Sequence, residues 1–242
     1  MVASPLAQFE ITTLIPLHVG EYNISFTNSA FFMALSVMAV MVFMVAGMRK
    51  GAMVPGRWQL CVEMCYGFVA NMLHEAAGRD ARKYFPFVFS LFMFILFANL
   101  IGMFPYFGFT FTSHIAVTFA MASFVFVGVT LIGLYKHGFK FFTLFVPKGA
   151  PLALMPLLVV IELVSYLSRP ISLSVRLFAN MVAGHTMLKV FGGFVVTLGM
   201  LGVVPFAFIV ALIGLELLVA CLQAYVFTIL TCMYLNDALH LH

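Results

Sequence analysis

Charged side chains are scarce in this sequence. They make up 8% of its 242 residues, against about 25% in an ordinary soluble domain. Hydrophobic residues reach 64%, and the mean hydropathy is +1.14. The net charge of +4 reflects a few loop residues and gives no basis for a nucleic-acid partner. Because the apolar residues form unbroken runs and do not alternate with polar ones, we expect an all-α polytopic membrane protein in a lipid bilayer.

Cysteine is also rare, with four residues in the chain: Cys61, Cys65, Cys221 and Cys232. Cys61 and Cys65 share one helical face, but no second Cys or His pair lies at metal-binding spacing. We therefore expect the cysteines to pack, with no disulfide framework, no metal and no cofactor. Residues 1–28 contain no Lys or Arg. They lack the basic region of a signal peptide, so we expect the chain to insert as written.

The apolar runs predict a single membrane domain over residues 1–242. Spanning helices are expected over residues 29–48, 85–104 and 115–135, followed by a long antiparallel hairpin of helices 151–198 and 203–235 hinged at 199–202. Both long helices exceed the bilayer thickness, so they must tilt or bend, and Pro170 is the expected bend. Residues 55–78 carry a narrow polar stripe, which favours an amphipathic helix in the membrane interface. A further spanning helix is the alternative for this segment.

Lys and Arg predict the orientation of these helices. Nine of the twelve lie in connecting segments that alternation places on one face: Arg49, Lys50, Arg57, Arg79, Arg82, Lys83, Lys136, Lys140 and Lys148. The opposite loops, Pro105–Ser113 and Leu198–Val203, have none. The basic face is therefore expected to be cytoplasmic, or on the matrix side, with the N-terminus outside and the C-terminus inside. A spanning segment 55–78 would put basic loops on both sides.

The first long helix carries the remaining basic residues, Arg169, Arg176 and Lys189. Glu162, Arg169 and Arg176 are spaced seven residues apart, so they share one face; Ser172 and Asn180 lie near it. An arginine keeps its charge at physiological pH. A charge at bilayer depth costs roughly 2.5–3.5 kcal/mol on insertion scales, and such charges mark ion pathways. Two roles are open for Arg169, tuning a channel or forming a salt bridge to Glu162. Lys189 is expected at the membrane interface.

An antiparallel hairpin hinged near residue 200 predicts which polar residues face each other. The expected pairs are Arg176 with Gln223, His185 with Glu216, and Glu162 with Asp237. Along the first long helix, His185 lies about 13 Å from Arg176 on one side and Glu162 about 21 Å away on the other. Histidine and carboxylates relay protons, whereas arginine does not. The pattern thus predicts two half-routes separated by a fixed cation, with a proton-carrying carboxylate supplied by another subunit.

The segment RPISLSVRLFANMVAGH, residues 169–185, resembles the signature of the a subunit (subunit 6) family of F-type ATP synthases. The family pattern is R-L-x-x-N followed by A-G, and its matches here are Arg176, Leu177, Asn180, Ala183 and Gly184. Further positions resembling the family are Glu162, Asn99, Leu215, Glu216 and the run Gln223–Phe227. The placement of His185 and Glu216 on separate helices is similar to that in alphaproteobacterial and mitochondrial members.

The resemblance implies a stator that faces a c-ring, held by peripheral stalk b-type subunits. Arg176 would attract a deprotonated c-ring carboxylate and prevent a direct proton leak. His185 and Glu216 would line the outer half-channel, and Glu162 with Asp237 the inner one. No Walker-type phosphate loop appears, so ATP chemistry is expected on other subunits. The implied location is a bacterial inner membrane, with the mitochondrial inner membrane as alternative. A self-contained secondary transporter or ion channel is the alternative function, but the chain shows no internal repeats.

Overall fold

The computed structural model describes residues 11–16, 18–19, 22–23, 25–49, 54–103, 110–145 and 154–240. Of the basic loop residues considered above, Lys50 and Lys148 lie outside these ranges. So do residue 104 of the predicted span 85–104, residues 105–109 of the charge-free turn and residues 151–153 of the first long helix. Within the described ranges, five helices are long and apolar enough to cross a membrane. The protein is therefore an all-α polytopic membrane protein, as the composition predicts.

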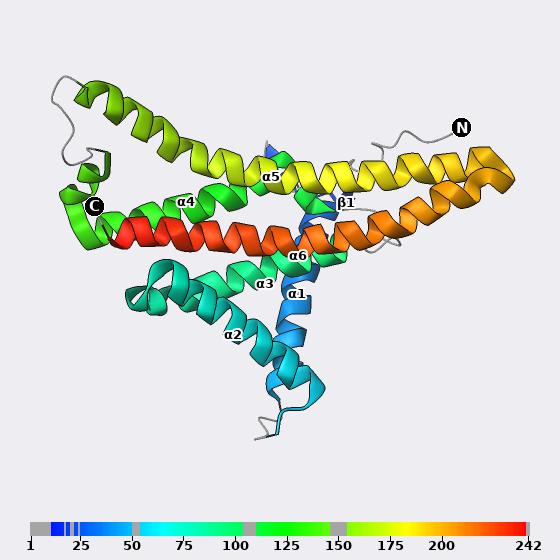
Figure 1. Ribbon diagram of the computed structural model, residues 1–242, viewed down its shortest axis with the longest axis horizontal. Helices are drawn as coiled ribbons and strands as arrows, with labels where there is room; N and C mark the ends of the chain where they lie inside the picture. The colour runs from blue at the N-terminus through cyan, green and yellow to red at the C-terminus, as the bar shows by residue number, and fades with distance from the viewer. Residues whose placement is uncertain are drawn as a thin grey trace.

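Six α-helices make up most of the fold (Figure 1). Their bounds are α1 Asn28–Met48, α2 Arg57–Ala77, α3 Phe85–Gly102, α4 Ile115–His137, α5 Met155–Leu198 and α6 Val203–Leu239. Short 3₁₀ segments join several of them: η2 Arg79–Tyr84, η3 Phe111–Ser113, η4 Gly138–Phe145 and η5 Gly199–Gly202. The five candidate spans use α1, α3, α4, α5 and α6, whereas α2 is not among them.

Two small antiparallel ladders precede α1. β1 (Thr13–Ile15) pairs with β4 (Phe26–Thr27), and β2 (His18–Val19) pairs with β3 (Tyr22–Asn23). These strands of two or three residues are too short to show the alternating pattern by which a strand is predicted. No pattern in the sequence therefore predicts these strands. The Thr27 side chain accepts a hydrogen bond from the backbone N–H of Ala30 and so caps the start of α1.

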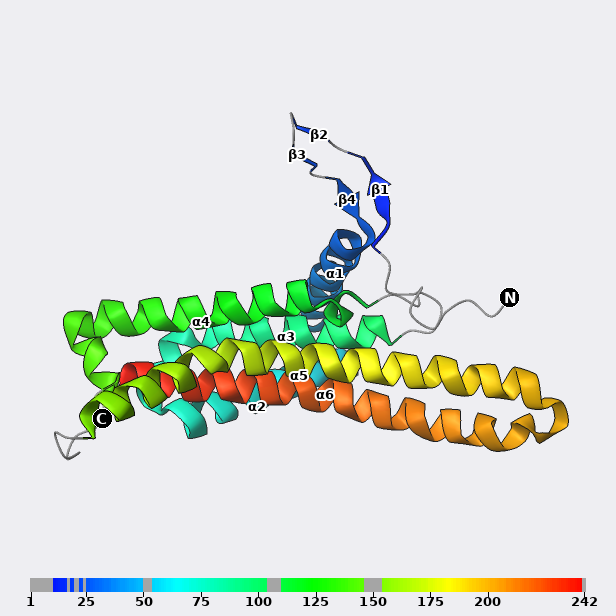
Figure 2. The same cartoon turned by 90° about the horizontal axis from the view of Figure 1, so that it is seen from above.

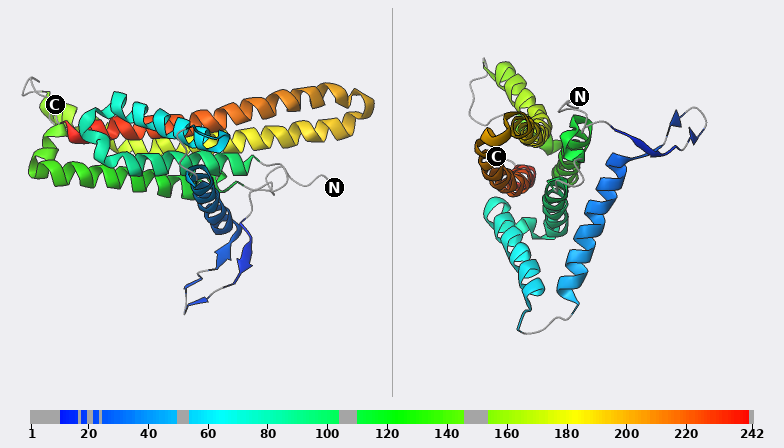
Figure 3. Two further views of the ribbon diagram at one scale, coloured as in Figure 1. Left: turned by 90° about the horizontal axis from the view of Figure 1, so that it is seen from below. Right: turned by 90° about the vertical axis from the view of Figure 1, so that its right-hand side faces the viewer.

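Helices α3 to α6 run broadly along one direction, and α1 crosses them steeply (Figures 1 and 2). The end-on view in Figure 3 shows α5 and α6 along their axes, with α1 seen lengthwise. Helix α6 occupies the centre, in contact with α2, α3, α4 and α5. Its buried face includes Ala220, Ala224 and Thr228 at every fourth position. Small side chains at this spacing let neighbouring helices approach closely, as is common in membrane proteins.

The hairpin of α5 and α6 is much longer than a bilayer requires. The 44 residues of α5 correspond to about 66 Å at the α-helical rise, compared with about 30 Å of hydrocarbon. Figure 1 shows α5 bending in its first half, which contains Pro170. The hinged end extends past the other helices, and the side chains of Val196, Val203 and Val204 are exposed there. The exposed apolar end of the hairpin has room for lipid or for another chain.

Gly199 provides the backbone conformation that the hinge requires. Gly199 ends α5 with a φ of 56°, a conformation in which a Cβ costs about 1–2 kcal/mol. We expect Gly199→Ala to destabilise the protein by about that amount. Gly192→Ala is the matched control, because a Cβ there meets open space within α5 and should stabilise the helix by about 0.5–1 kcal/mol. Thermal unfolding in detergent followed by circular dichroism measures both; shifts of equal sign would contradict this role for Gly199.

Candidate functional site

His185 and Glu216 form a buried pair between α5 and α6. The Nδ1 atom of His185 lies 2.8 Å from Oε1 of Glu216, and the two residues are 8% and 9% exposed. This contact confirms the facing pair expected from a hinge near residue 200. An acidic and a basic group buried together stabilise each other only as a pair, because either charge alone would be costly in an apolar interior.

The imidazole of His185 also contacts a backbone carbonyl of α3, the side chain of Thr110 and a backbone carbonyl of its own helix. Its Nε2 atom lies 3.0 Å from the carbonyl oxygen of Gly102 at the end of α3 and 3.0 Å from Oγ1 of Thr110. Its Nδ1 atom lies 3.1 Å from the carbonyl oxygen of Met181. A carbonyl oxygen can only accept a hydrogen bond. Both ring nitrogens are thus placed to donate, which suits an imidazolium with Glu216 as its counter-ion.

Gly184 makes room for this pair. A Cβ atom at Gly184 would lie 2.7 Å from Oε1 of Glu216 and 3.0 Å from its Cδ atom. Any larger residue would therefore displace the carboxylate from its position beside His185. The close approach gives a physical reason for glycine in the A-G part of the sequence signature.

A second polar contact joins α5 and α6, further from the hinge than the first. The Nδ2 atom of Asn180 donates a hydrogen bond of 2.9 Å to Oε1 of Gln223, which is only 1% exposed. The expected direct partner of Gln223 was Arg176, so the structure corrects the pairing by about one helical turn of α5. Nε2 of Gln223 is buried and has no hydrogen-bond partner among the described residues.

Arg176 itself is exposed on α5. Its guanidinium makes no ion pair and no hydrogen bond with any part of the chain that the structure describes. Ser172, one turn earlier on the same helix, is exposed as well. The described residues therefore leave this cation without a counter-ion.

Arg169 pairs with Asp237 and not with Glu162. Its Nη1 atom lies 3.0 Å from Oδ2 of Asp237, and its guanidinium lies over the rings of Tyr166 and Tyr234 at 5.2 Å and 4.8 Å. A bridge from Arg169 to Glu162 was wrong, because seven residues separate them by about 10 Å along the helix. Helical side chains lean toward the N-terminus of their helix. The long Arg169 side chain therefore contacts Asp237, although an antiparallel register hinged near residue 200 does not place these two residues opposite each other.

Glu162 consequently lacks the partner expected for it. The predicted pair of Glu162 and Asp237 is not formed, since Asp237 pairs with Arg169. Glu162 is partly exposed and has no ion pair among residues 154–240 or the other described ranges. From the hinge outward, the hairpin thus carries a buried His–Glu pair, an amide pair, an uncompensated arginine, an Arg–Asp pair and a free carboxylate.

The sequence pattern did not indicate two residues of this site, Gly102 and Thr110, and the structure shows what a third, Asn99, contacts. Gly102 precedes the charge-free turn and Thr110 lies within it, and nothing in their local pattern indicates contact with His185. The Oγ1 atom of Thr110 also donates to the Gly102 carbonyl oxygen at 3.2 Å. Asn99, fully buried in α3, donates a 3.3 Å hydrogen bond from Nδ2 to the carbonyl oxygen of Ala220. It therefore helps hold α6 against α3 just before Gln223.

Across the described ranges, no group of three His, Cys, Asp or Glu side chains is placed to hold a metal ion. The described cysteines are all free thiols. The titratable side chains of the hairpin, His185, Glu216 and Glu162, can bind protons, and the guanidinium of Arg176 can attract an anion.

Comparisons with known proteins agree over the whole length of the chain. A family model described as "ATP synthase A chain" matches residues 30–236. The chain is 62% identical to "ATP synthase subunit a" of Parvibaculum lavamentivorans, over 98% of this chain and 93% of that protein. It is 57% identical to the protein of the same name from Pelagibacter ubique, and 56% identical to that from Paramagnetospirillum magneticum, each over 100% of both chains.

The His185–Glu216 contact predicts strong coupling in a double-mutant cycle. We expect His185→Ala and Glu216→Ala each to cost about 3–5 kcal/mol, because each leaves a buried charge unpaired. The double variant should cost clearly less than the sum. Unfolding in detergent, followed by circular dichroism, measures all three variants. As a control, Lys189→Ala and Cys221→Ala are exposed changes on the same helices and should add within about 0.5 kcal/mol. Additive costs for His185 and Glu216 would contradict the coupling.

Proposed function

The chain belongs to the ATP synthase A chain family, and we propose that this membrane-sector subunit conducts protons to and from a c-ring past the fixed charge of Arg176. The observation that carries this proposal is the exposed guanidinium of Arg176, which lacks a counter-ion among the described residues while the neighbouring charges are paired. A cation kept in that state needs an anion from another subunit. A c-ring carboxylate has the required charge.

The outer half-channel in this proposal ends at His185 and Glu216. Their nearest atoms lie 2.8 Å apart and both groups can carry a proton, and Thr110 contacts the imidazole from the other side. A proton arriving there neutralises a c-ring carboxylate held near Arg176. The neutral carboxyl group no longer attracts the guanidinium, so the ring can carry it away into the lipid.

The inner half-channel begins on the other side of Arg176. Glu162 has no ion-pair partner in the described chain and is free to accept a released proton. The Arg169–Asp237 pair lies between Glu162 and Arg176 and sets the local potential there. Two unit charges 4 Å apart interact by about 4 kcal/mol at an effective dielectric constant of 20. Arg176 can therefore promote ionisation of an approaching carboxyl group, and it blocks protons because it cannot release its own.

Orientation and partners follow from the same proposal. The face rich in Lys and Arg is cytoplasmic by the positive-inside rule, so the N-terminus is periplasmic and the C-terminus cytoplasmic in a bacterial inner membrane. Helix α2 lies in the interface of this single membrane domain, where peripheral stalk b-type subunits have access to it. ATP chemistry takes place on other subunits. A self-contained transporter would need its own mobile carboxylate beside Arg176, and the described residues provide none.

Arg176→Ala tests the proposed role of the fixed charge. We expect ATP-driven proton pumping by inverted membrane vesicles to fall to background, because the c-ring carboxylate loses its counter-ion. ATP hydrolysis by the detached soluble sector should continue. Acidification of the vesicle lumen, read with a fluorescent pH indicator, measures the first quantity and phosphate release the second.

Lys189→Ala is the matched control for Arg176. It removes an exposed basic side chain from the same helix, outside the polar contacts of the hairpin, and should leave pumping near the wild-type rate. Coupled pumping that persists in Arg176→Ala would exclude the proposed role.

Thr110→Val tests whether the hydroxyl beside His185 positions it for proton transfer. The substitution keeps the shape of the side chain and removes the oxygen that lies 3.0 Å from Nε2. We expect pumping to slow by about tenfold, since a hydrogen bond to a charged group contributes roughly 1.5–3 kcal/mol. Thr110→Ser retains the hydroxyl and should pump almost normally. Equal rates for the valine and serine variants would show that the hydroxyl has no role in transfer.

A further inference from the structure

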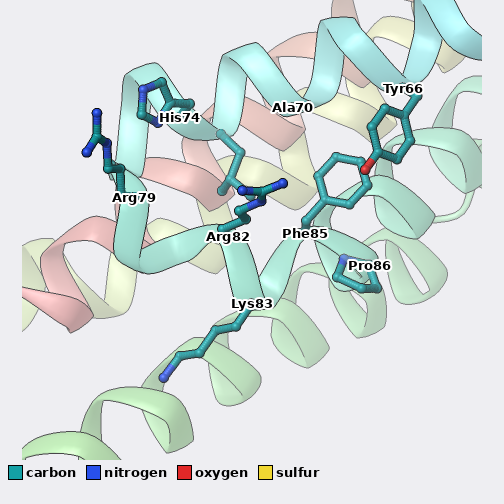
Figure 4. A pocket seen from close by; sticks show the side chains of 10 residues that line it. Tyr66, Ala70, His74, Arg79, Arg82, Lys83, Phe85 and Pro86 are labelled. Atoms are coloured by element: carbon teal, nitrogen blue, oxygen red, sulfur yellow. The ribbon is translucent and has the colours of Figure 1, made fainter.

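A pocket far from the hairpin hinge lies between the end of α2, η2 and the start of α3 (Figure 4). Its volume is about 640 Å³. Figure 4 shows His74 and Arg79 at one end, the guanidinium of Arg82 over the middle, and the rings of Tyr66 and Phe85 at the other end. The pocket is therefore basic at one end and apolar at the other.

The basic end carries charge that the described chain does not neutralise. Asp80, the acidic residue within η2, faces His240 of the C-terminal end of α6 at 3.7 Å. Glu75 is exposed on α2 and does not line the pocket. Neither Arg79 nor Arg82 forms an ion pair with a described residue. Two guanidinium groups in this position suit an anion with several oxygen atoms, such as a phosphate.

The apolar end continues into a second pocket of about 550 Å³ between α1, α2 and α3. The two pockets share Tyr66, Phe85 and Pro86. The Tyr66 and Phe85 rings are 4.6 Å apart, and Phe85 stacks on Phe89 at 5.5 Å. Met44, Met48 and Val62 line this second pocket, together with Gln59 and Glu63, whose side chains are hydrogen-bonded to each other at 2.8 Å. A chain of methylene groups leaving the basic pocket would pass over aromatic rings into a groove whose lining is mostly apolar.

The position of these two adjoining pockets in the sequence also indicates that they lie near the membrane surface. The basic residues of η2 come directly before Phe85, where the apolar helix α3 begins. Lys and Arg at the end of a membrane helix lie at the level of the lipid head groups. A phosphate bound there would have its attached chains directed into hydrocarbon, in the direction of the second pocket.

We propose that the pocket of Arg79 and Arg82, with the adjoining groove under Tyr66 and Phe85, binds one anionic phospholipid, with its phosphate on the two guanidinium groups and an acyl chain in the groove. A free phosphate or nucleotide would satisfy the basic end alone and would leave the groove unused. An acidic protein segment would match the charge, but it would not require an apolar groove continuous with the basic pocket.

Binding of fluorescently labelled phosphatidylglycerol to the purified full chain in detergent tests the proposal. For Arg79→Gln with Arg82→Gln, we expect the dissociation constant to rise about 30-fold, because each basic side chain near an anionic lipid contributes about 1 kcal/mol. Arg49→Gln with Arg57→Gln removes the same charge from exposed positions outside both pockets and should change it little. Arg79→Lys with Arg82→Lys should retain most of the affinity. All positions are exposed, and circular dichroism checks that each variant is folded.

Competition separates the possible ligands. Unlabelled phosphatidylglycerol should displace the probe, whereas phosphatidylcholine, inorganic phosphate and glycerol 3-phosphate should not. Displacement by the phosphates as effective as that by the lipid, or equal affinities for the two glutamine variants, would overturn the proposal. A photoreactive residue at Ala70 should yield a phospholipid adduct in native membranes, and a protein adduct in its place would assign the pocket to a protein segment.

Discussion

A positive charge that cannot be titrated away, placed on an apolar helix hairpin, is the constraint on which this structure depends. Arg176 needs either a permanent partner or a reason to lack one. The hairpin supplies permanent partners to its neighbours: Asp237 to Arg169 and Glu216 to His185. It leaves Arg176 exposed. The selective pairing matters more than the charge itself, because an internal counter-ion at Arg176 would compete with any carboxylate from another subunit.

The same constraint explains much of the packing around α6. Buried polar groups need partners, and these must come from neighbouring helices held at close range. Small residues on α6 allow that approach, and Gly184 gives the Glu216 carboxylate its space. The carbonyl oxygen of Gly102 then reaches His185 from α3. Three segments distant in sequence thus meet at one imidazole, and the helix contacts and the polar contacts support each other.

Sequence reasoning could predict the helices, the hinge and the His185–Glu216 contact, because apolar run length and an antiparallel register determine them. It erred where side-chain reach decides the partner, as for Arg169 with Asp237 and Asn180 with Gln223. It missed Thr110 altogether, because an uncharged turn residue carries no periodic or charge signal. The β-ladders before α1 were missed for a similar reason, since their strands are shorter than the pattern that identifies a strand.

In the proposed function, this subunit must resist the force that it helps to generate. Each proton crossing the membrane releases about 2.3 kcal/mol per 100 mV, and the proposed contact at Arg176 would transmit that force to a hairpin whose hinged end extends past the other helices. The opposite half of α6 is held by α2, α3 and α4. Helix α2 in turn borders the basic pocket at the membrane surface. A phospholipid bound there would join α1, α2 and α3 through one molecule and would stiffen the side of the protein that restrains α6.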